Sequence, residues 1–253
     1  MDFRRILLGC LGICLLLAPA RADEPVTSAP DGRKSIRVGV FDNSPIAIVR
    51  PNAEPEGIAM DVLYAVAAQE SWRFTYVPGT WNELLKLLDQ GQIDILVGIA
   101  YSEERARRYR FNRESLLGNW AMVYRHSGTK ISSLLDLKGQ PVALMRGSIH
   151  SQVFSRSMKD FGLSFVPLYV DTFAQVLMAV DRGEAKAGVV NRTFGTINAH
   201  RYGDVVETGI VFNPVYVHYA SPKEASPALL QTLDGDIHFL GHRSLRHDLF
   251  HLL

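Results

Sequence analysis

Ile93-Asp94-Ile95-Leu96-Val97 is a nearly unbroken apolar run in this sequence. Strands of a parallel sheet give such runs because helices cover both of their faces, whereas a strand with one face in water alternates apolar and polar residues. The run therefore predicts a buried parallel strand. A parallel sheet in turn requires helices between its strands, and the flanking sequence should supply them.

The residues before this run alternate between strand and helix patterns. We expect strands at residues 36–40 and 74–77, and helices at residues 58–70 and 81–90, with Gly91 closing the second helix. Together with the apolar run they give the order strand, helix, strand, helix, strand. This order is typical of the α/β class.

The same order begins again in the second half of the chain. The predicted elements are a strand at 141–144, a helix that follows it to Phe161, a strand at 164–169, a helix at 173–182 and a buried strand at 187–190. Two successive α/β units of about 100 residues each imply two lobes. A cleft between two lobes is a favoured place for a ligand.

The first residues have the pattern of a secretory signal. Arg4 and Arg5 precede an apolar run at residues 6–18, and Ala20-Arg21-Ala22 matches the small-residue pattern of a cleavage site. We therefore expect residues 1–22 to be a signal peptide and residues 23–34, which are polar, to be a disordered leader. The mature protein is expected in the periplasm.

The composition excludes several kinds of function. Cys10 and Cys14 are the only cysteines and both lie in the signal segment, so we expect no disulfide, thiol nucleophile or cysteine-bound metal. The signal segment holds three of the 27 basic and one of the 26 acidic residues, which leaves the mature chain a net charge of −1. This balance argues against nucleic acid as a partner.

Several short motifs occur in a fixed order along the chain. They are Pro55 to Asp61, Gly91-Gln92-Ile93-Asp94, Gly98 to Arg105, Tyr109-Arg110-Phe111-Asn112, Leu135 to Gly139, and Gly147-Ser148. In kind, order and spacing they resemble bacterial extracellular solute-binding protein family 3, whose members bind polar amino acids. The resemblance covers residues 35–253, and the stretches 144–148 and 190–192 are most similar to sensory domains of that family.

The resemblance implies a periplasmic-binding-protein type II fold, in which each lobe is a mostly parallel sheet flanked by helices and a two-strand hinge joins the lobes. Lobe 1 would comprise residues 35–115 and 219–253, and lobe 2 would comprise residues 116–218 with the hinge crossings. The last segment would then return to the first lobe.

The resemblance also implies a function. By this resemblance the chain is similar to monomeric binding proteins that have no enzymatic activity and no cofactor. Such a protein closes on a small carboxylate-bearing ligand and delivers it to an ABC-type permease. Two alternatives stay open. One is a sensing subunit that reports to a histidine kinase or a diguanylate cyclase, and the other is a dehydratase-like enzyme on the same fold.

In the family, the arginine at the position of Arg105 makes a bidentate contact with the ligand carboxylate. A planar, permanently charged guanidinium suits that contact. The alternative is an exposed ion pair with Glu103 or Glu104. Ser102 would add a hydroxyl donor, whereas Ala100 stands where the family usually has Ser or Thr, so one customary hydrogen bond is missing.

Gly147 and Ser148 lie where a strand is expected to meet a helix. The free N–H groups and the dipole of a helix N-terminus attract an anion, so these residues would hold the same carboxylate from the second lobe. The alternative is a serine that only caps its helix.

Asn191 is a departure from the family pattern. Amino-acid binders carry an Asp at this position that pairs with the α-ammonium group of the ligand, and an amide cannot neutralise that charge. The asparagine therefore weakens the case for an ordinary amino acid as ligand. The alternative is a residue that only ends its strand.

Asn43 and Trp120 complete the predicted ligand contacts, although either residue could equally belong to the core or the rim of the cleft. A metal site is not expected. His238 and His242, and then His247 and His251, are spaced as pairs that can bind Zn²⁺, but no cysteine or H-E-x-x-H motif supports that use.

Overall fold

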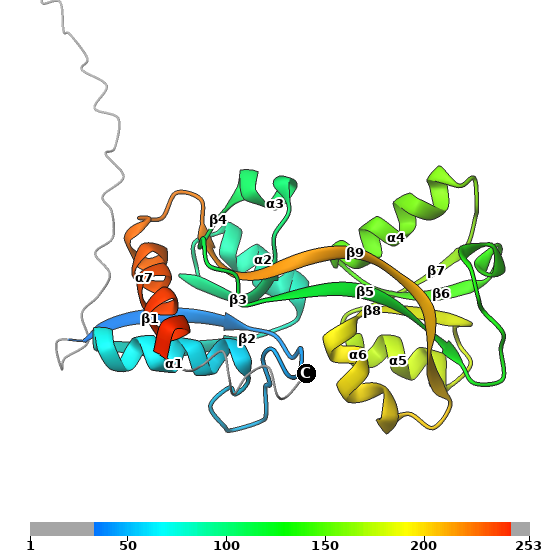
Figure 1. Ribbon diagram of the computed structural model, residues 1–253, viewed down its shortest axis with the longest axis horizontal. Coiled ribbons are helices and arrows are strands. Elements are labelled where there is room, and N and C mark those ends of the chain that lie inside the picture. The colour runs from blue at the N-terminus through cyan, green and yellow to red at the C-terminus, as the bar shows by residue number, and fades with distance from the viewer. Residues whose placement is uncertain (1–32, 244–253) are drawn as a thin grey trace, which may run out of the picture.

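The computed structural model describes residues 33–243 and shows two lobes joined by two long strands (Figure 1). The predicted signal peptide, most of the predicted leader, and His247 and His251 lie outside the described residues, as do the side chains of His238 and His242. No helix within residues 33–243 combines the length and apolarity that crossing a membrane requires.

The elements of the first lobe alternate as expected. They are β1 (Lys34–Val40), α1 (Ile58–Glu70), β2 (Trp72–Pro78), α2 (Trp81–Asp89), β3 (Ile95–Ala100), α3 (Glu103–Arg108) and β4 (Tyr109–Phe111), with α7 (Ala228–Arg243) from the end of the chain. β1 pairs in parallel with both β2 and β3. α7 packs beside α1, because Leu230 and Leu233 are buried in the same core as Leu63.

The second lobe repeats the arrangement. Its elements are η1 (Leu134–Leu137), β6 (Pro141–Met145), α4 (Ile149–Asp160), β7 (Val166–Val170), α5 (Phe173–Asp181), β8 (Ala187–Asn191), α6 (Arg192–Asn198) and η2 (Ala199–Arg201). β6 pairs in parallel with β7 and β8. The predicted α/β class and two-lobed architecture are therefore confirmed.

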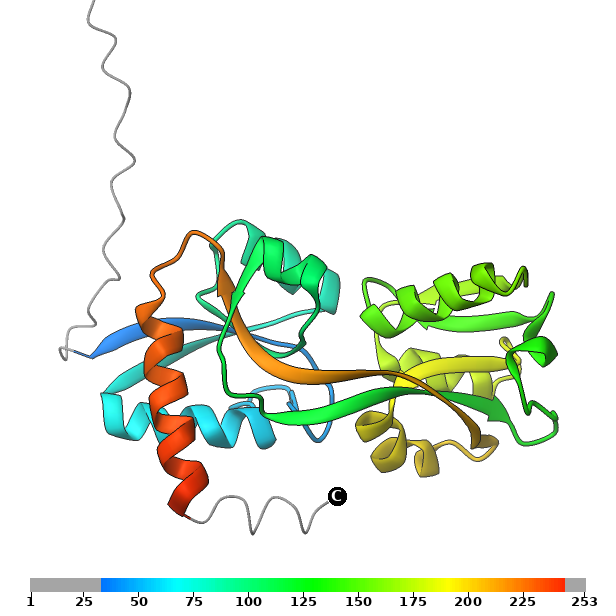
Figure 2. The same ribbon diagram turned by 45° about the horizontal axis from the view of Figure 1, so that its top comes forward.

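β5 (Leu117–His126) and β9 (Val205–Pro222) connect the lobes. They pair with each other in antiparallel fashion and lie in the middle of one continuous sheet, whose order is β2-β1-β3-β9-β5-β8-β6-β7. At about 3.3 Å per residue, the 18 residues of β9 extend roughly 60 Å, long enough to run through both lobes (Figure 2).

Several predicted boundaries shift by one or two residues, and two of these shifts bear on the leader and on the first apolar run. β1 begins at Lys34, the last residue of the predicted leader, and β3 begins at Ile95 instead of Ile93. The second shift has a clear cause. The Asp94 carboxylate accepts hydrogen bonds from the backbone N–H of Arg37 at 2.7 Å and from its guanidinium at 2.6 Å, so Asp94 is bound to the edge of β1 before the ladder starts.

The loop after β1 is held against the start of α1, and this fixes one wall of the site described below. Gly57 has a φ of 108°, and a Cβ atom there would lie 2.6 Å from the carbonyl oxygen of Pro45. Ile58 and Ala59 donate backbone hydrogen bonds to the carbonyls of Pro45 and Ile46. Only glycine fits this approach.

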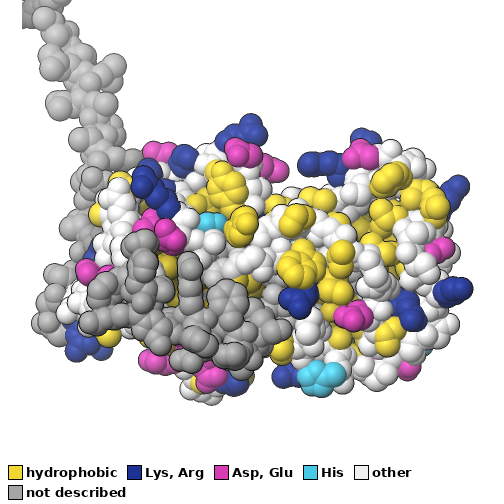
Figure 3. All heavy atoms as spheres, in the orientation of Figure 1, with side chains coloured by type: hydrophobic (Ala, Val, Ile, Leu, Met, Phe, Trp, Pro, Cys, Tyr) yellow, Lys and Arg dark blue, Asp and Glu magenta, His cyan; other side chains and the backbone are white. Residues whose placement is uncertain are grey.

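On the face shown in Figure 3, basic and acidic side chains are interspersed over both lobes, and no large field of one sign covers it. Apolar side chains gather over the middle of the molecule. β9 carries two exposed apolar side chains, Val211 and Tyr216, which are 56% and 65% exposed.

Candidate functional site

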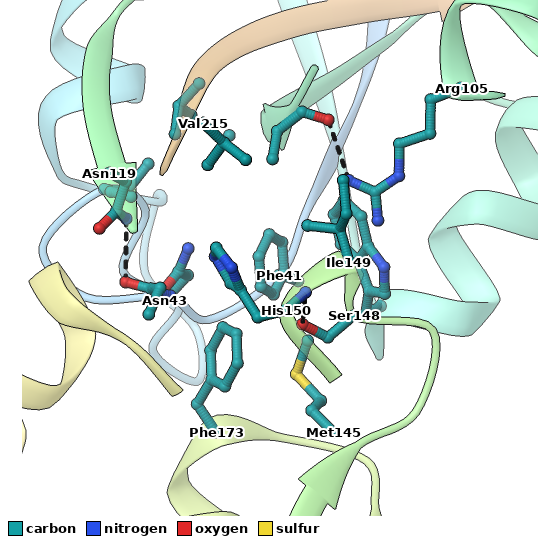
Figure 4. A pocket seen from close by; sticks show the side chains of 16 residues that line it. Phe41, Asn43, Arg105, Asn119, Met145, Ser148, Ile149, His150, Phe173 and Val215 are labelled. Carbon is teal, nitrogen blue, oxygen red and sulfur yellow. Dashed lines mark hydrogen bonds between the residues drawn. The ribbon is translucent and has the colours of Figure 1, made fainter. Parts of the chain in front are cut away.

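A cavity of about 40 Å³ lies between the lobes (Figure 4). It is lined by residues at or just beyond the carboxyl ends of four parallel strands: Asn43 after β1, Ala100 at the end of β3, Met145 at the end of β6 and Asn191 at the end of β8. Ligands of open α/β sheets bind beyond these ends. Here the strands of both lobes point their carboxyl ends at the same space.

The cavity has an apolar wall and a set of polar groups. The apolar wall comprises Phe41, Ile46, Trp81, Ile149, Phe173 and Val215, with Met145 and Val217. The polar side chains are those of Asn43, Arg105, Asn119, Ser148, His150 and Asn191. Among these described lining residues there is no Asp or Glu.

Arg105 crosses from the first lobe to the second. Its side chain is 9% exposed; Nη1 donates to the carbonyl of Ala100 at 2.9 Å and Nη2 donates to the carbonyl of Gly147 at 3.2 Å. The guanidinium lies 5.2 Å from the centre of the Trp81 ring, and Trp81 Nε1 donates to the same Gly147 carbonyl at 3.0 Å. Neutral groups therefore position the cation.

Within the part of the chain that the structure describes, the charge of Arg105 is not paired with an acidic side chain. Burial lowers the pKa of Arg105 to about 10, so the side chain stays protonated at neutral pH. No described carboxylate forms an ion pair with it. Glu103 and Glu104, the alternative partners considered from the sequence, are exposed in the first turn of α3. A buried cation without a counter-ion is unfavourable, and an anion in the cavity would relieve that cost.

Ser102 shapes α3 and does not line the cavity. Its hydroxyl oxygen accepts from the backbone N–H of Arg105 at 3.2 Å, which caps the helix and fixes the residue that carries the guanidinium. Ser102 and Gly147 instead line a neighbouring pocket of about 290 Å³ between α2, α3 and α4. Arg105 lines both spaces and separates them.

Gly147 and Ser148 form the junction of β6 and α4. Gly147 has a φ of 70°, and a Cβ atom there would collide with Asn82 of the first lobe. The Ser148 hydroxyl oxygen caps α4 by accepting from the backbone N–H of His150 at 3.2 Å. Ser148 therefore caps its helix, as the alternative reading held, and it also lines the cavity.

Three asparagine amides form a chain at the opposite end of the cavity from Arg105. Asn119 Nδ2 donates to Asn191 Oδ1 at 3.1 Å, and Asn191 Nδ2 donates to Asn43 Oδ1 at 2.9 Å. Asn43 belongs to the first lobe, Asn191 to the second and Asn119 to the connecting strand β5. A further amide, that of Asn198, donates to the carbonyl of Ser44 at 3.4 Å across the same gap.

His150 follows Ser148 in the first turn of α4 and was not predicted as a site residue. It is buried, and Asn213 Nδ2 of β9 lies 2.9 Å from its Nδ1. Burial, with a smaller effect of the nearby Arg105 charge, lowers the pKa of His150 from 6.5 to about 3. The ring is therefore neutral at any pH near 7.

Trp120 is a predicted contact that the structure turns to another use. It does not line the cavity; its indole packs under the guanidinium of Arg192, 4.6 Å from the ring centre. Of the predicted contacts, the structure brings Asn43, Arg105, Ser148 and Asn191 together around the cavity. Ligand contact itself stays a prediction for all of them. Among the side chains that the structure describes, no three metal-ligating residues come together.

Two lining residues, Asn119 and His150, carried weak sequence signals. Asn119 lies in the predicted hinge crossing, where a buried polar residue has no structural need unless it meets another polar group. His150 lies in the first turn of a helix whose start was predicted. The place of both residues beside the cavity follows from the way the two lobes pack together, which the local sequence does not reveal.

Both the sequence and the fold match known proteins. The family model of bacterial extracellular solute-binding proteins, family 3, matches residues 36–239. A curated relative is the probable amino-acid-binding protein YxeM of Bacillus subtilis, 25% identical over 168 residues. That match covers 66% of this chain and 63% of the relative, so the chain matches less than two thirds of the relative's length.

Solved structures share the fold. A histidine kinase sensor domain with similarity to periplasmic binding proteins has a TM-score of 0.73 and 24% identity, over 84% of this chain and 92% of that one. An ancestral arginine-binding protein bound to arginine has a TM-score of 0.74 and 22% identity, over 83% and 93%. Holo ArgBP from T. maritima has a TM-score of 0.73 and 20% identity, over 82% and 90%.

Proposed function

The chain belongs to bacterial extracellular solute-binding protein family 3, and from this premise we propose that it binds a small carboxylate-bearing molecule in the periplasm and delivers it to an ABC-type transporter. Residues 1–22 would direct its export. Membership of the family makes it a ligand-binding protein. The proposal goes beyond family membership in three respects: the carboxylate group of the ligand, the periplasmic location and the transporter.

The observation that carries the carboxylate is the unpaired charge of Arg105. The guanidinium is buried at the cavity, and neutral carbonyls and an indole hold it in place. Three of its five N–H groups make no hydrogen bond with a described residue. A carboxylate can take two of them in the bidentate geometry that Arg favours, and it would neutralise the charge at the same time.

Closure of the lobes supplies the signal to the membrane partner. We place lobe 1 at residues 35–115 and 219–253 and lobe 2 at residues 116–218, with the crossings in β5 and β9 acting as the hinge. Arg105 to Gly147 and Asn191 to Asn43 are hydrogen bonds between these lobes, so they form only when the cleft is closed. A bound ligand would add contacts to both sides of the same cleft and favour that state.

A sensing role is the second candidate. A histidine kinase sensor domain has the same fold at a TM-score of 0.73, which is as similar as the arginine-binding proteins. Closure would then report to a kinase or a cyclase. Neighbouring permease and ATPase genes would favour transport, and a neighbouring kinase or cyclase gene would favour sensing.

The dehydratase-like alternative has less support. The described residues that line the cavity include no carboxylate that could serve as a general base, and the neutral His150 is the only titratable side chain there besides Arg105. Turnover of a cyclic hydroxy acid or keto acid by the purified protein would establish catalysis.

A thermal-shift screen tests the proposed ligand class. The panel should hold amino acids, dicarboxylates, aromatic and aliphatic monocarboxylates, and as contrast sugars and amines without a carboxyl group. A ligand at 100 times its dissociation constant stabilises the folded state by about 2.7 kcal/mol, which a melting curve detects. We expect every hit to carry a carboxylate. A hit confined to sugars or amines would contradict the proposal.

A further inference from the structure

The polar side chains of the cavity present mainly N–H groups. Arg105 supplies guanidinium N–H groups at one end, and the chain formed by Asn43, Asn119 and Asn191 supplies amide N–H groups at the other. The orientation of each asparagine amide, oxygen or NH₂ toward a given neighbour, decides what the cavity can recognise. Hydrogen bonds to the backbone fix this orientation.

Backbone N–H groups set the orientation of two of the amides. The oxygen of Asn119 accepts from the N–H of Trp120 at 3.0 Å and from the N–H of Thr193 at 3.4 Å. The oxygen of Asn191 accepts from the N–H of Phe194 at 2.9 Å. A backbone N–H can only donate, so both oxygens are acceptors in these positions and neither amide can be flipped.

The rest of the chain follows from these two assignments. With its oxygen facing the backbone, Asn119 turns its NH₂ group to the oxygen of Asn191, which then accepts two hydrogen bonds and has no free lone pair. The NH₂ group of Asn191 must donate to the oxygen of Asn43. One N–H each on Asn119 and Asn191, and two on Asn43, remain without a partner among the described residues.

His150 adds a donor of the same kind. Asn213 Nδ2 lies 2.9 Å from Nδ1. In the neutral tautomer that suits this contact, Nδ1 accepts from the amide and Nε2 carries the proton. Nε2 makes no hydrogen bond with a described residue. The acceptors left on the lining side chains are neutral, namely one lone pair of Asn43 Oδ1 and the hydroxyl of Ser148.

An α-ammonium group would fare badly in this cavity. It brings a positive charge and three N–H donors to a place that already holds the unpaired Arg105 cation and faces it with further donors. No lining carboxylate among the described residues is available to neutralise it. An oxygen that only accepts, such as a keto oxygen, would instead satisfy the free N–H groups of the amide chain.

We infer that the ligand is a small monocarboxylate whose second polar group is an uncharged hydrogen-bond acceptor, with 2-oxo acids as the best-fitting class. The inference rests on the proposed function and names its substrate class. The carboxylate lies against Arg105, the acceptor oxygen faces the chain of Asn43, Asn119 and Asn191, and the carbon skeleton packs on Phe41 and Phe173.

Matched acids test the inference. For three carbon skeletons of increasing size, the 2-oxo, 2-hydroxy and L-2-amino acids are titrated into the full mature protein by calorimetry: pyruvate, lactate and alanine; 3-methyl-2-oxobutanoate, its hydroxy analogue and valine; and phenylpyruvate, phenyllactate and phenylalanine. On the skeleton that binds best, we expect the 2-oxo acid to bind at least tenfold more tightly than the amino acid, with the hydroxy acid between them.

The possible results distinguish the proposed binding of carboxylates from the inferred preference for 2-oxo acids. If an amino acid binds as tightly as its 2-oxo analogue, or if only dicarboxylates bind, the inference is overturned and the proposed carboxylate function stands. If the protein binds only molecules that lack a carboxylate, both fail.

A variant that introduces a negative charge into the cavity gives a second readout, which is the ratio of the affinities for the 2-oxo acid and the amino acid. N191D keeps an oxygen that accepts from Phe194 and Asn119 but places a carboxylate in the cavity, so the preference for the 2-oxo acid over the amino acid should fall at least tenfold. N198D is the matched control, because Asn198 is a buried asparagine at the end of α6, the helix that Asn191 caps, and does not line the cavity. If N198D changes the preference equally, or if N191D leaves it unchanged, the assigned role of the amide chain is wrong.

Discussion

The two ends of the cavity differ in what holds them in place. At one end Arg105 is charged, has no acidic partner among the described residues, and contacts two carbonyls and an indole. At the other end Asn119 and Asn191 are neutral, and their oxygens are bound to backbone N–H groups. The first end has unused binding capacity, whereas much of the second is used by the fold.

This difference teaches which residues serve the ligand alone and which also serve the structure. Removing the guanidinium should affect binding far more than folding, because Trp81 still donates to the Gly147 carbonyl. Removing an amide from the chain should affect folding directly, because its partners stay buried without hydrogen bonds.

The largest expected effect is on ligand affinity in R105A. Truncating one partner of a buried charge-assisted pair costs about 2–5 kcal/mol, so the dissociation constant of a carboxylate hit should rise at least about 30-fold. The melting temperature of the free protein should stay nearly unchanged. Calorimetry and a melting curve of the same preparation measure both quantities.

R108A is the matched control for that change. Arg108 lies in the same helix and forms an exposed ion pair with Asp89 at 2.5 Å, and such pairs contribute at most about 1 kcal/mol. If R108A weakens binding as much as R105A does, the effect comes from α3 as a whole and not from the buried cation.

The next effect is on folding, at the amide end. N191A removes the N-cap of α6 and leaves Asn43 Oδ1 and an N–H of Asn119 without their partner. We expect the free energy of unfolding to fall by about 2–4 kcal/mol, measured by urea denaturation. A loss below about 0.5 kcal/mol would show that the chain is not part of the folded state in solution.

The pH dependence of stability should report on His150. Its pKa is about 3 in the folded protein and near 6.5 when unfolded, so the unfolded state binds the extra proton between these values. Stability is therefore full above pH 6.5 and decreases as the pH falls, by about 2 kcal/mol at pH 5.

H150Q separates this contribution from others. Burial also lowers the pKa of His218, so some slope should remain in the variant. Urea denaturation of both proteins at pH 5 and pH 8 should show a smaller pH difference in H150Q. An identical difference would mean that His150 is not buried in its neutral form.

The smallest effect is expected at the junction that Arg105 contacts. G147A introduces a side chain at a φ of 70° and against Asn82 of the opposite lobe, so it should destabilise the fold by about 1–2 kcal/mol and also weaken binding several-fold. G183A has a φ of 69° and an open surrounding, so it should show the backbone strain alone. Equal binding losses in both variants would exclude a role for the contact with Asn82.

The sequence predicted the fold more fully than the site. Apolar runs and helix caps are local, and they placed most strands and helices within two residues. Ile93 was assigned to a strand because its apolarity is visible, whereas the ion pair of Asp94 with Arg37 that delays the strand is not. The cavity residues Asn43, Arg105, Ser148 and Asn191 were accessible through family motifs.

Other site features depend on how the lobes meet. Asn119 and His150 acquire their partners, Asn191 and Asn213, from elements that are distant in sequence. Ser102 was predicted as a contact because its hydroxyl lies in the same loop as Arg105, and Trp120 because it lies near the expected rim of the cleft. A helix cap and the stacking of Arg192 instead turn their side chains away from the cavity.

The central claim is that Arg105 recognises a ligand carboxylate, and one thermodynamic cycle tests it most directly. The best acid and its primary amide, which has the same shape without the charge, are titrated into the native protein and into R105A by calorimetry. We predict that the amide binds at least about 30-fold more weakly than the acid to the native protein and that R105A no longer distinguishes the two. If R105A prefers the acid by the same factor, another group recognises the carboxylate and the account is wrong.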